Sequence, residues 1–555
     1  MSTRAAIQAS LPLGAALIVL VVLGDVWLAR IPYPFDLEWM EGGMLGHAWR
    51  LAHGQSLYGP PSPDFAPFIY PPGYSAVVAA LGGVFGLSPG LGRAVSVVAV
   101  LAAAGSIVFG VLRAGGARAV ACAAGATFLA TYPHAGAFYD LVRPDSLAVA
   151  LLGWSIVIAL EDRRGAPVAA GLLLAASFLV KHNTALFGLP IALGLLVRRP
   201  RDAVAFVAAA AGPALAVVGL LQWRSGGGFL TYLLEVPRHH KMIWARATVD
   251  LPREVGTALP LVFAAIGGWA VWRGATRQRS LPTWLATVVP VWSGMLMGWW
   301  GTYHPPREPL LLVPSGVGYW GLTAAAVALG VRVLGTLLDV RAGRAMLPSW
   351  REVFGVSVAA TAVVGAIAMR VHDGGYTNVH MPMFLVLSLG FGVALTRWVQ
   401  ALPHLVTAVA VIAALQPLYG ASRIDRIKLK PRAVDEEAGW EMVRAVREVS
   451  GPILSPTAAW IPVYAGREPS IHAMAVWDLN YAGGPYQDDL SSISAALRAR
   501  EYTLILGGTH RFLGKLTDYY EPDHVFLEPK DDRLWPRTGW RSRPWRLLVP
   551  KESAD

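Results

Sequence analysis

Apolar runs of membrane-spanning length, interrupted by Pro, Gly or charged residues, recur along most of this sequence. About 20 apolar residues in a helix cross the hydrocarbon core of a bilayer, so the series predicts a mainly α, polytopic bundle of about thirteen spans. The runs lie near residues 9–29, 91–112, 119–138, 144–160, 166–180, 184–197, 203–223, 255–272, 282–300, 309–331, 353–370, 380–396 and 402–419. The Pro-led run 70–87 predicts a re-entrant or half-spanning helix, and 169–197 is compatible with one hairpin or one long helix.

Composition supports a membrane protein. The chain of 555 residues is 54% hydrophobic and only 15% charged, with a mean hydropathy of +0.46, values that are rare for a soluble enzyme. The formal net charge of +11 does not indicate a nucleic-acid partner, because Lys and Arg fall mostly in short links between apolar runs, as the positive-inside rule predicts. The single cysteine, Cys122, excludes an intramolecular disulfide and a Cys-based metal site.

The basic links fall on alternate turns, which predicts a cytoplasmic N-terminus and places the intervening loops outside. Charge rises and the apolar runs end after residue 420. We therefore expect a transmembrane domain over 1–420 and a small extracytoplasmic α/β domain over 421–555, with alternating elements. Its expected helices lie at 436–450, 456–466 and 488–501, and its expected strands at 451–455, 502–508 and 545–550.

Three acids, Asp36, Glu38 and Glu41, follow the first apolar run in the predicted first external loop. One interpretation is that they are solvated charges near a membrane surface. The other is that a carboxylate is partly desolvated in a folded loop with short interfacial helices, where it acts as a general base on a hydroxyl. The flanking "IPYPF" and "FIYPPGY" favour a folded loop.

Cations occupy two other places near the predicted external face. Arg143 and Asp145, in "YDLVRPD", suit either a helix entry with Arg143 reaching lipid phosphate or a site where Arg143 binds a substrate phosphate. Lys181 and His182 interrupt an apolar sequence, where an ionisable group is costly unless it is functional. A lipid-linked phosphate is the partner we expect for Lys181.

Further polar residues lie in two later external loops. "GTYHPPRE" contains His304, and "GGYTNVH" contains Asn378 and His380. Asn378 and His380 suit hydrogen bonds to sugar hydroxyls, and Asn378 equally suits a helix cap. The histidines lack the spacing of known zinc motifs, so the metal ligands stay unknown. The sequence indicates no particular cofactor. It is compatible with a divalent cation.

The sequence lacks the phosphate loop, the G-x-S-x-G elbow and the H-E-x-x-H motif. ATPase, serine hydrolase and zincin chemistry are therefore not indicated. The stretches "FDLEWMEGG", "GQSLYG", "FIYPPGY", "YDLVRPDSLAVALLGW" and "GGYTNVHMPMF", together with Lys181, carry a resemblance instead. Their order and common sidedness resemble integral-membrane glycosyltransferases of fold type C that use polyprenyl-phosphate sugars, the superfamily of bacterial protein mannosyltransferases and aminoarabinose transferases.

The resemblance implies that the catalytic acid of the first external loop is Asp36, with Glu38 as its companion. The family commonly has adjacent acids, whereas Leu37 intervenes here, so Asp36, Glu38 and Glu41 all stay open as the base. The resemblance also implies a multi-pass protein of the inner (plasma) membrane and cell envelope. The substrate-binding set that we expect is Glu41, Tyr70, Arg143, Asp145, Lys181, His182, His304, Asn378 and His380.

The implied reaction transfers a sugar, with inversion, from a polyprenyl-phosphate donor to a hydroxyl of an extracytoplasmic glycan, lipid or protein. Lys181 and Arg143 would stabilise the departing phosphate. Membrane lipids would be further partners, because they surround the bundle. Two alternatives stay open. A flippase or transporter of lipid-linked saccharides predicts ionisable groups near the middle of several spans, often with an inverted repeat. A non-catalytic envelope scaffold predicts dispensable loop acids.

Overall fold

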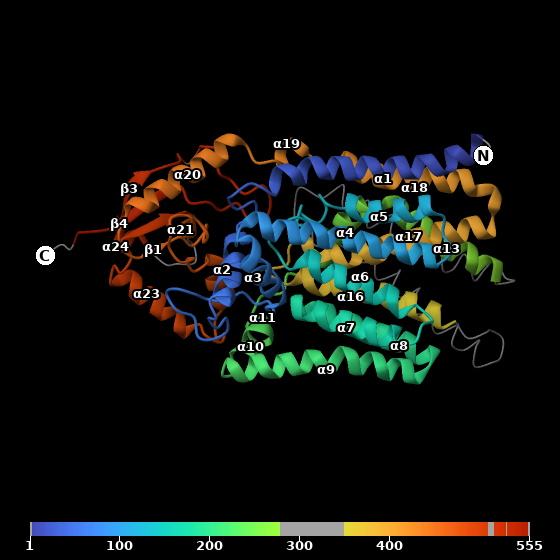
Figure 1. Ribbon diagram of the computed structural model, residues 1–555, viewed down its shortest axis with the longest axis horizontal. Coiled ribbons are helices and arrows are strands. Elements are labelled where there is room, and N and C mark those ends of the chain that lie inside the picture. Colours follow the sequence, from blue (N-terminus) through green and yellow to red (C-terminus); the bar gives the residue numbers. More distant parts are fainter. Residues whose placement is uncertain (1–2, 278–348, 509–515, 529, 553–555) are drawn as a thin grey trace, which may run out of the picture.

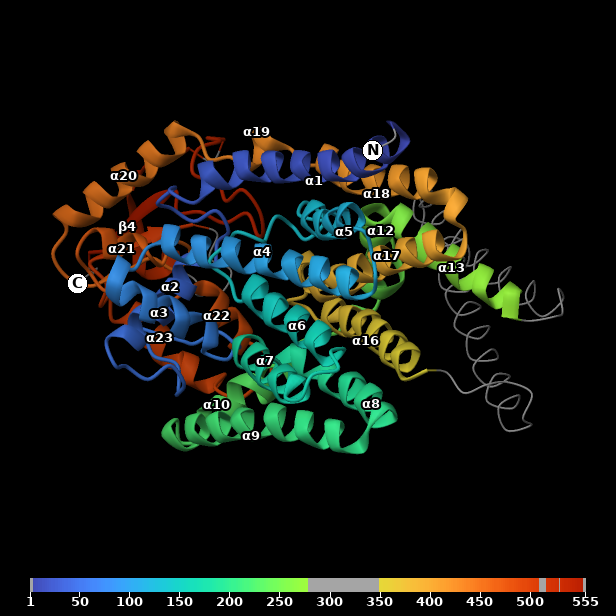
Figure 2. The same ribbon diagram turned by 45° about the vertical axis from the view of Figure 1, so that its right-hand side comes forward.

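The computed structural model describes residues 3–277, 349–508, 516–528 and 530–552. The predicted spans 282–300 and 309–331, and His304, lie outside the described residues. The prediction of a mainly helical chain with a small C-terminal sheet is confirmed. Figures 1 and 2 show the helices bundled along the long axis, with the sheet at one end and the N-terminus near the other.

Six helical segments in the described ranges are long and apolar enough to cross a membrane. They comprise Gln8–Arg30 within α1 (Thr3–Arg30), α4 (Pro89–Arg113), α9 (Pro200–Arg224), α16 (Trp350–Val371), Thr377–Ala401, which contains α17 (Met381–Ala401), and Pro403–Ser422, which contains α18 (Val406–Ser422). The predicted count of about thirteen spans is not confirmed, because several predicted runs form shorter helices. These are α5 (Arg118–Ala130), α6 (Asp145–Ala159), α7 (Ala166–Val180), α8 (Gly188–Arg198) and α13 (Pro260–Arg277). The additional run 70–87 forms the short helix α3 (Gly73–Phe85).

The run 169–197 is neither one helix nor a simple hairpin. Helix α7 ends at Val180, Lys181 is extended, and the 3-10 helix η1 (His182–Phe187) leads into α8. The bundle therefore has a break in its backbone at Lys181. Irregular backbone inside a membrane bundle is tolerated where protein encloses it or where it lines a cavity.

Short helical pieces and turns connect the spans. Between α9 and α13 they are α10 (Gly228–Leu230), η2 (Thr231–Glu235), α11 (Val236–Arg238), η3 (Arg246–Asp250) and α12 (Leu251–Ala258). Two 3-10 turns, η4 (Thr377–His380) and η5 (Pro403–Leu405), precede α17 and α18.

The C-terminal part forms a four-stranded sheet with helices around it. Its strands are β1 (Ile453–Leu454), β2 (Leu504–Gly507), β3 (Tyr520–Val525) and β4 (Arg546–Pro550), in the order β1-β2-β4-β3. Strands β1 and β2 are parallel and the other pairs are antiparallel. The accompanying helices are α19 (Arg426–Leu429), α20 (Ala433–Glu448), α21 (Ile461–Tyr464), α22 (Ala473–Leu479), η6 (Asp488–Leu490), α23 (Ser491–Arg498) and α24 (Leu516–Tyr519). Three strands lie where the sequence predicted them, whereas β3 was not predicted.

Helix α2 (Glu41–Ala52) lies between the bundle and the sheet, as Figures 1 and 2 show. Its first eight residues are all buried, so it is enclosed on every side over two turns. The glycine pair at its start allows this packing: a Cβ on Gly43 would lie 2.5 Å from Phe68 Cζ, and one on Gly42 would lie 3.0 Å from Trp460 N. The C-terminal layer thereby reaches the backbone of the first loop.

Candidate functional site

Glu41 organises the loop that carries the other two acids. Its Oε2 accepts from the Leu37 amide at 2.7 Å and its Oε1 from the Val142 amide at 2.9 Å. The Arg93 guanidinium binds both carboxylate oxygens, at 3.0 and 2.7 Å, and neither side chain is exposed. The interpretation of these acids as solvated charges is wrong for Glu41 and for Glu38, which is 2% exposed.

Arg93 also binds the backbone of the first loop and of the end of α1. It donates to the carbonyl oxygens of Arg30, Tyr33 and Phe35. Arg30 in turn pairs with Asp140 at 2.6 Å, again with both side chains fully buried. Sequence reasoning missed this network, although Arg93 interrupts an apolar run and Asp140 belongs to "YDLVRPD", the kind of signal that marks a paired buried charge.

Arg143 joins the first loop to the segment before α6. Its Nη1 donates to Glu38 Oε2 at 3.2 Å, and its Nη2 donates to the Tyr70 hydroxyl at 3.2 Å. Arg143 is 5% exposed. The interpretation in which it reaches out to lipid phosphate is therefore wrong for this conformation, and the side chain points into the protein.

Asp145 forms an ion pair with the second cation of the site, Lys181. Lys181 Nζ donates to Asp145 Oδ1 at 2.5 Å, and Asn378 Nδ2 donates to the same oxygen at 2.7 Å. The other oxygen, Oδ2, lies 3.7 Å from Arg143 Nε. Asn378 holds Asp145 and makes no side-chain cap to α17 or η4. The sequence predicted a lipid-linked phosphate as the partner of Lys181; in the structure its counter-ion is a carboxylate of the chain itself, Asp145.

These contacts connect six of the predicted residues. We call them the Arg143 cluster: Glu38, Tyr70, Arg143, Asp145, Lys181 and Asn378. They come from the first loop, the start of α6, the end of α7 and η4. Segments far apart in the sequence therefore meet at the end of the bundle that faces the sheet (Figure 2).

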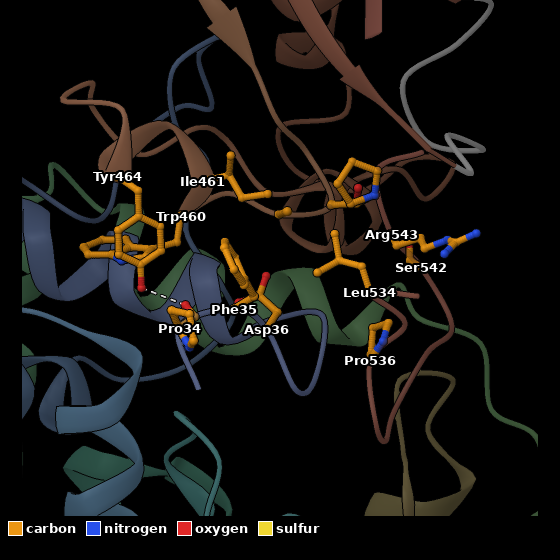
Figure 3. Close-up of a pocket in the computed structure, with 13 residues that line it drawn as sticks. Pro34, Phe35, Asp36, Trp460, Ile461, Tyr464, Leu534, Pro536, Ser542 and Arg543 are labelled. Atoms are coloured by element: carbon orange, nitrogen blue, oxygen red, sulfur yellow. Dashed lines mark hydrogen bonds between the residues drawn. The ribbon is translucent and has the colours of Figure 1, made fainter. Parts of the chain in front are cut away.

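Asp36 faces a different space from Glu38. It lines a small pocket bounded by the first loop and the C-terminal part. Figure 3 shows Asp36 between Phe35 and Leu534, with Trp460, Ile461 and Tyr464 on the adjoining wall. We call this the Asp36 pocket; its other lining residues are Pro34, Thr457, Ala458, Pro536, Ser542, Arg543 and Pro544. No member of the Arg143 cluster lines it.

The C-terminal part also covers the loop between the two acids. The Arg537 and Thr538 amides both donate to the Leu37 carbonyl, at 2.8 and 3.2 Å. The next residue, Gly539, has φ +74°, and a Cβ there would lie 2.7 Å from Glu38 Cγ. The segment 537–539 therefore limits the positions that the Glu38 side chain can take.

Burial gives the three acids different proton affinities. Burial, reinforced by the Glu41 charge, raises the pKa of Asp36 well above its ordinary value although Arg93 opposes the shift. Burial raises the pKa of Glu38 to about 7 against the attraction of Arg143. For Glu41 burial is outweighed by Arg93 and by backbone donors, which hold its pKa below the ordinary value. Asp36 and Glu38 are the stronger proton acceptors once ionised.

Two of the predicted histidines, His182 and His380, are not members of the Arg143 cluster. His380 Nε2 contacts Glu254 Oε2 at 2.7 Å, and Arg370 binds both oxygens of Glu254, at 2.9 and 2.6 Å. Glu254 and Arg370 were not singled out from the sequence. His182 follows Lys181 in η1, and its Nδ1 has no hydrogen-bond partner among the described residues. His304 lies outside the described residues.

No group of three His, Cys, Asp or Glu side chains that could hold a metal ion occurs within 3–277, 349–508, 516–528 and 530–552. His239 and His240 are adjacent in the segment before η3. His240 is buried, and its Nε2 contacts the Asp478 carbonyl at 2.8 Å. His239 bonds its own helix at the Glu235 carbonyl. The pair therefore serves local packing in the described conformation, and the metal ligands stay unknown.

No protein-family model and no curated protein matches the sequence. Among solved structures, ArnT from Cupriavidus metallidurans bound to undecaprenyl phosphate is similar at 14% identity and a TM-score of 0.47, over 97% of this chain and 98% of that one. The Archaeoglobus fulgidus oligosaccharyltransferase in complex with Zn and sulfate is similar at 13% identity and a TM-score of 0.40, over 89% and 67%. Likeness at these scores carries no argument about function, which depends on the site itself.

Proposed function

We propose that this chain is a membrane glycosyltransferase that moves a sugar from a polyprenyl-phosphate donor to an acceptor hydroxyl. The observation that carries the proposal is the Arg143 cluster: two cations and two carboxylates meet beside a break in an apolar helix. Charges enclosed at the end of an apolar bundle are costly to maintain and mark functional sites by default.

Lys181 and Arg143 are the phosphate ligands in this proposal. The Lys181 side chain retains 12% of its exposure, and Arg143 has an Nε without a hydrogen-bond partner among the described residues. A phosphate that entered here would compete with Asp145 and Glu38 for these donors. Guanidinium and ammonium groups stabilise charge that accumulates on a departing phosphate oxygen.

Asp36 and Glu38 are the candidate proton acceptors. Each has a pKa raised by burial, which makes the ionised form a stronger base toward a hydroxyl. Among the described residues Asp36 makes no side-chain ion pair, and it lines a small pocket, whereas Glu38 is held by Arg143. We therefore assign the base to Asp36 and the companion role to Glu38, with direct displacement and inversion at the anomeric carbon.

The apolar bundle suits the donor's tail. An isoprenoid chain stays in hydrocarbon while its phosphate reaches a polar site at the end of the bundle. The proposal places that end outside the inner membrane, with a transmembrane domain over 1–420 and an extracytoplasmic domain over 421–555. The described ion pairs of the Arg143 cluster lie at one end of the bundle, which favours this arrangement over a transport path through its middle.

The test is glycosyl transfer by the full chain in lipid nanodiscs, with a panel of polyprenyl-phosphate sugars and extracytoplasmic glycan, lipid and protein acceptors. We expect release of polyprenyl phosphate that depends on acceptor and is lost in Asp36→Asn. Donor binding should persist in that variant and weaken in Lys181→Ala. Movement of the intact lipid-linked sugar across the bilayer without cleavage would contradict the proposal and favour a flippase.

A further inference from the structure

Two buried histidines, His47 in α2 and His472 at the start of α22, enclose Phe68 where α2 meets the C-terminal part. The His47 ring stacks on the Phe68 ring with 4.9 Å between centroids, and the His472 ring packs edge-on against Phe68 at 5.4 Å. A Cβ on Gly43 would lie 2.5 Å from Phe68 Cζ and 3.0 Å from His472 Cγ. The rings of Phe68 and His472 therefore pack directly on the backbone of α2.

The hydrogen bonds of His472 place its proton on one ring nitrogen. Its Nδ1 accepts from the Met474 amide at 3.0 Å, so Nδ1 carries no proton. Nε2 therefore carries the proton and donates to the Trp39 carbonyl at 2.7 Å. Glu38, which directly precedes Trp39, accepts from Arg143. His472 thus joins the C-terminal part to the stretch that gives Arg143 its carboxylate partner.

His47 is held in the opposite tautomer. Its Nε2 accepts from the Phe68 amide at 2.9 Å, which leaves Nδ1 to donate to the Gly43 carbonyl at 2.7 Å. Tyr70, two residues after Phe68, accepts from Arg143 through its hydroxyl. His47 thus holds the stretch that gives Arg143 its second side-chain oxygen.

Both histidines are neutral at neutral pH. Burial lowers the pKa of His47 to about 4, and the Arg50 charge acts in the same direction. Burial also lowers the pKa of His472 to about 4, assisted by the Arg143 charge. Each accepting ring nitrogen faces a backbone N–H, so both hydrogen-bond patterns need the neutral imidazole.

We propose that His47 and His472 are positioning residues, whose neutral imidazoles fix the two backbone stretches that orient Arg143. The inference rests on the proposed function, in which Arg143 binds the phosphate of the lipid substrate. A guanidinium that is already oriented loses less conformational freedom when it binds a phosphate. Two residues with no expected contact to substrate would then set the affinity for the lipid phosphate, one of them from the C-terminal part.

His472→Gln and His472→Asn form a matched pair, since both remove the ring. The Gln nitrogen can take the place of Nε2 and donate to the Trp39 carbonyl, whereas the Asn oxygen can take the place of Nδ1 and accept from the Met474 amide. The pair therefore separates the contact with the first loop from the cap of α22. The control is His53→Asn, an exposed histidine at the end of α2.

The first measurement is binding of undecaprenyl phosphate to the full chain in nanodiscs. We expect the dissociation constant to rise about tenfold in His472→Asn, the equivalent of one hydrogen bond, and to stay near the wild-type value in His472→Gln and His53→Asn. His47→Gln keeps an acceptor for the Phe68 amide, so it should bind more tightly than His47→Asn. Thermal unfolding checks that each variant folds. Equal or reversed constants within either folded pair would overturn the role of that histidine.

The second measurement needs no substrate. Unfolding midpoints against pH, with Glu38→Gln as the reference, report the Glu38 titration, which lies at about 7 in the folded protein. We expect a lower value in His472→Asn, because a released loop exposes the carboxylate to water, and the wild-type value in His472→Gln. An unchanged titration in folded His472→Asn would overturn the inference. If the titrations differ as expected but the wild type does not bind undecaprenyl phosphate, the proposed lipid substrate alone is refuted.

Discussion

Glu41 and Arg93 form a two-point ion pair in which neither side chain is exposed. The pair joins α2 to α4 and fixes the loop that carries Asp36 and Glu38. Glu41 was expected among the substrate-binding residues, yet its oxygens are occupied by Arg93 and three backbone amides. We now propose a positioning role for it, which a stability measurement can separate from a role in substrate binding.

Glu41→Gln should destabilise the protein, because Arg93 would keep its charge in a buried place without a carboxylate. Loss of one partner of a buried pair costs about 3–5 kcal/mol. The measurement is the thermal unfolding midpoint in nanodiscs, with the exposed Glu468→Gln as the matched control. Equal midpoints for the two variants would show that the pair does not hold the loop.

Lys181→Ala should raise the donor KM and lower turnover, because the donor phosphate loses a cation and Asp145 loses its counter-ion. The double variant Lys181→Ala, Asp145→Asn separates these effects, since it removes the unpaired carboxylate as well. We expect the double variant to regain stability but not donor affinity. Recovery of donor affinity would mean that Lys181 acts only as a structural partner. Arg143→Ala should weaken donor binding less.

Asp36→Asn should lower kcat by about 10²–10⁴, the usual contribution of a general base, while donor binding persists. Glu38→Gln should lower kcat less, because Glu38 is already engaged by Arg143. Single-turnover transfer with saturating donor measures both. The opposite ranking would move the base to Glu38, and near-wild-type transfer in both variants would favour the scaffold or the transporter.

Gly539→Ala should impair transfer more than its effect on folding explains. Gly539 and Gly483 have similar positive φ angles, +74° and +72°, but only at Gly539 would a Cβ meet another residue, Glu38. Alanine is strained at either position, at a cost of about 1 kcal/mol. We expect a larger loss of thermal stability in Gly539→Ala, because its Cβ also displaces the buried Glu38 side chain, and a lower kcat of the folded protein in that variant alone. Equal kcat values would show that 537–539 does not position Glu38.

The raised pKa of Glu38 predicts a pH-dependent stability. The group titrates at about 7 in the folded protein against an ordinary value of 4.5. The folded state therefore binds its proton more tightly, and this stabilisation is fully present below pH 4.5 and is lost as the pH rises to about 7. Unfolding midpoints of Glu38→Gln, relative to wild type, should increase across that range. A difference that stays constant would contradict the shift.

Local patterns identified the acids and cations of the Arg143 cluster individually but not their partners. Lys181 was conspicuous because it interrupts an apolar run, whereas Asp145 lies 36 residues away in sequence and Asn378 lies 233 residues from Asp145. Arg93 was overlooked because a single charge in an apolar helix does not show which carboxylate it meets. Strand β3 was missed since "YEPDHV" contains Pro and exposed polar residues and lacks alternation.

The membrane class and the helical bundle could be predicted from the sequence alone, because hydropathy and charge are local properties. The domain boundary near residue 420 stays a prediction from the same patterns. The sequence could not show that Glu38 faces Arg143 while Asp36 faces the C-terminal part, because these contacts form in the folded chain. The two acids are two residues apart, and no periodicity governs an irregular loop. Their directions depend on Arg93 binding the loop carbonyls and on 537–539 packing over Leu37, contacts between segments that only folding brings together.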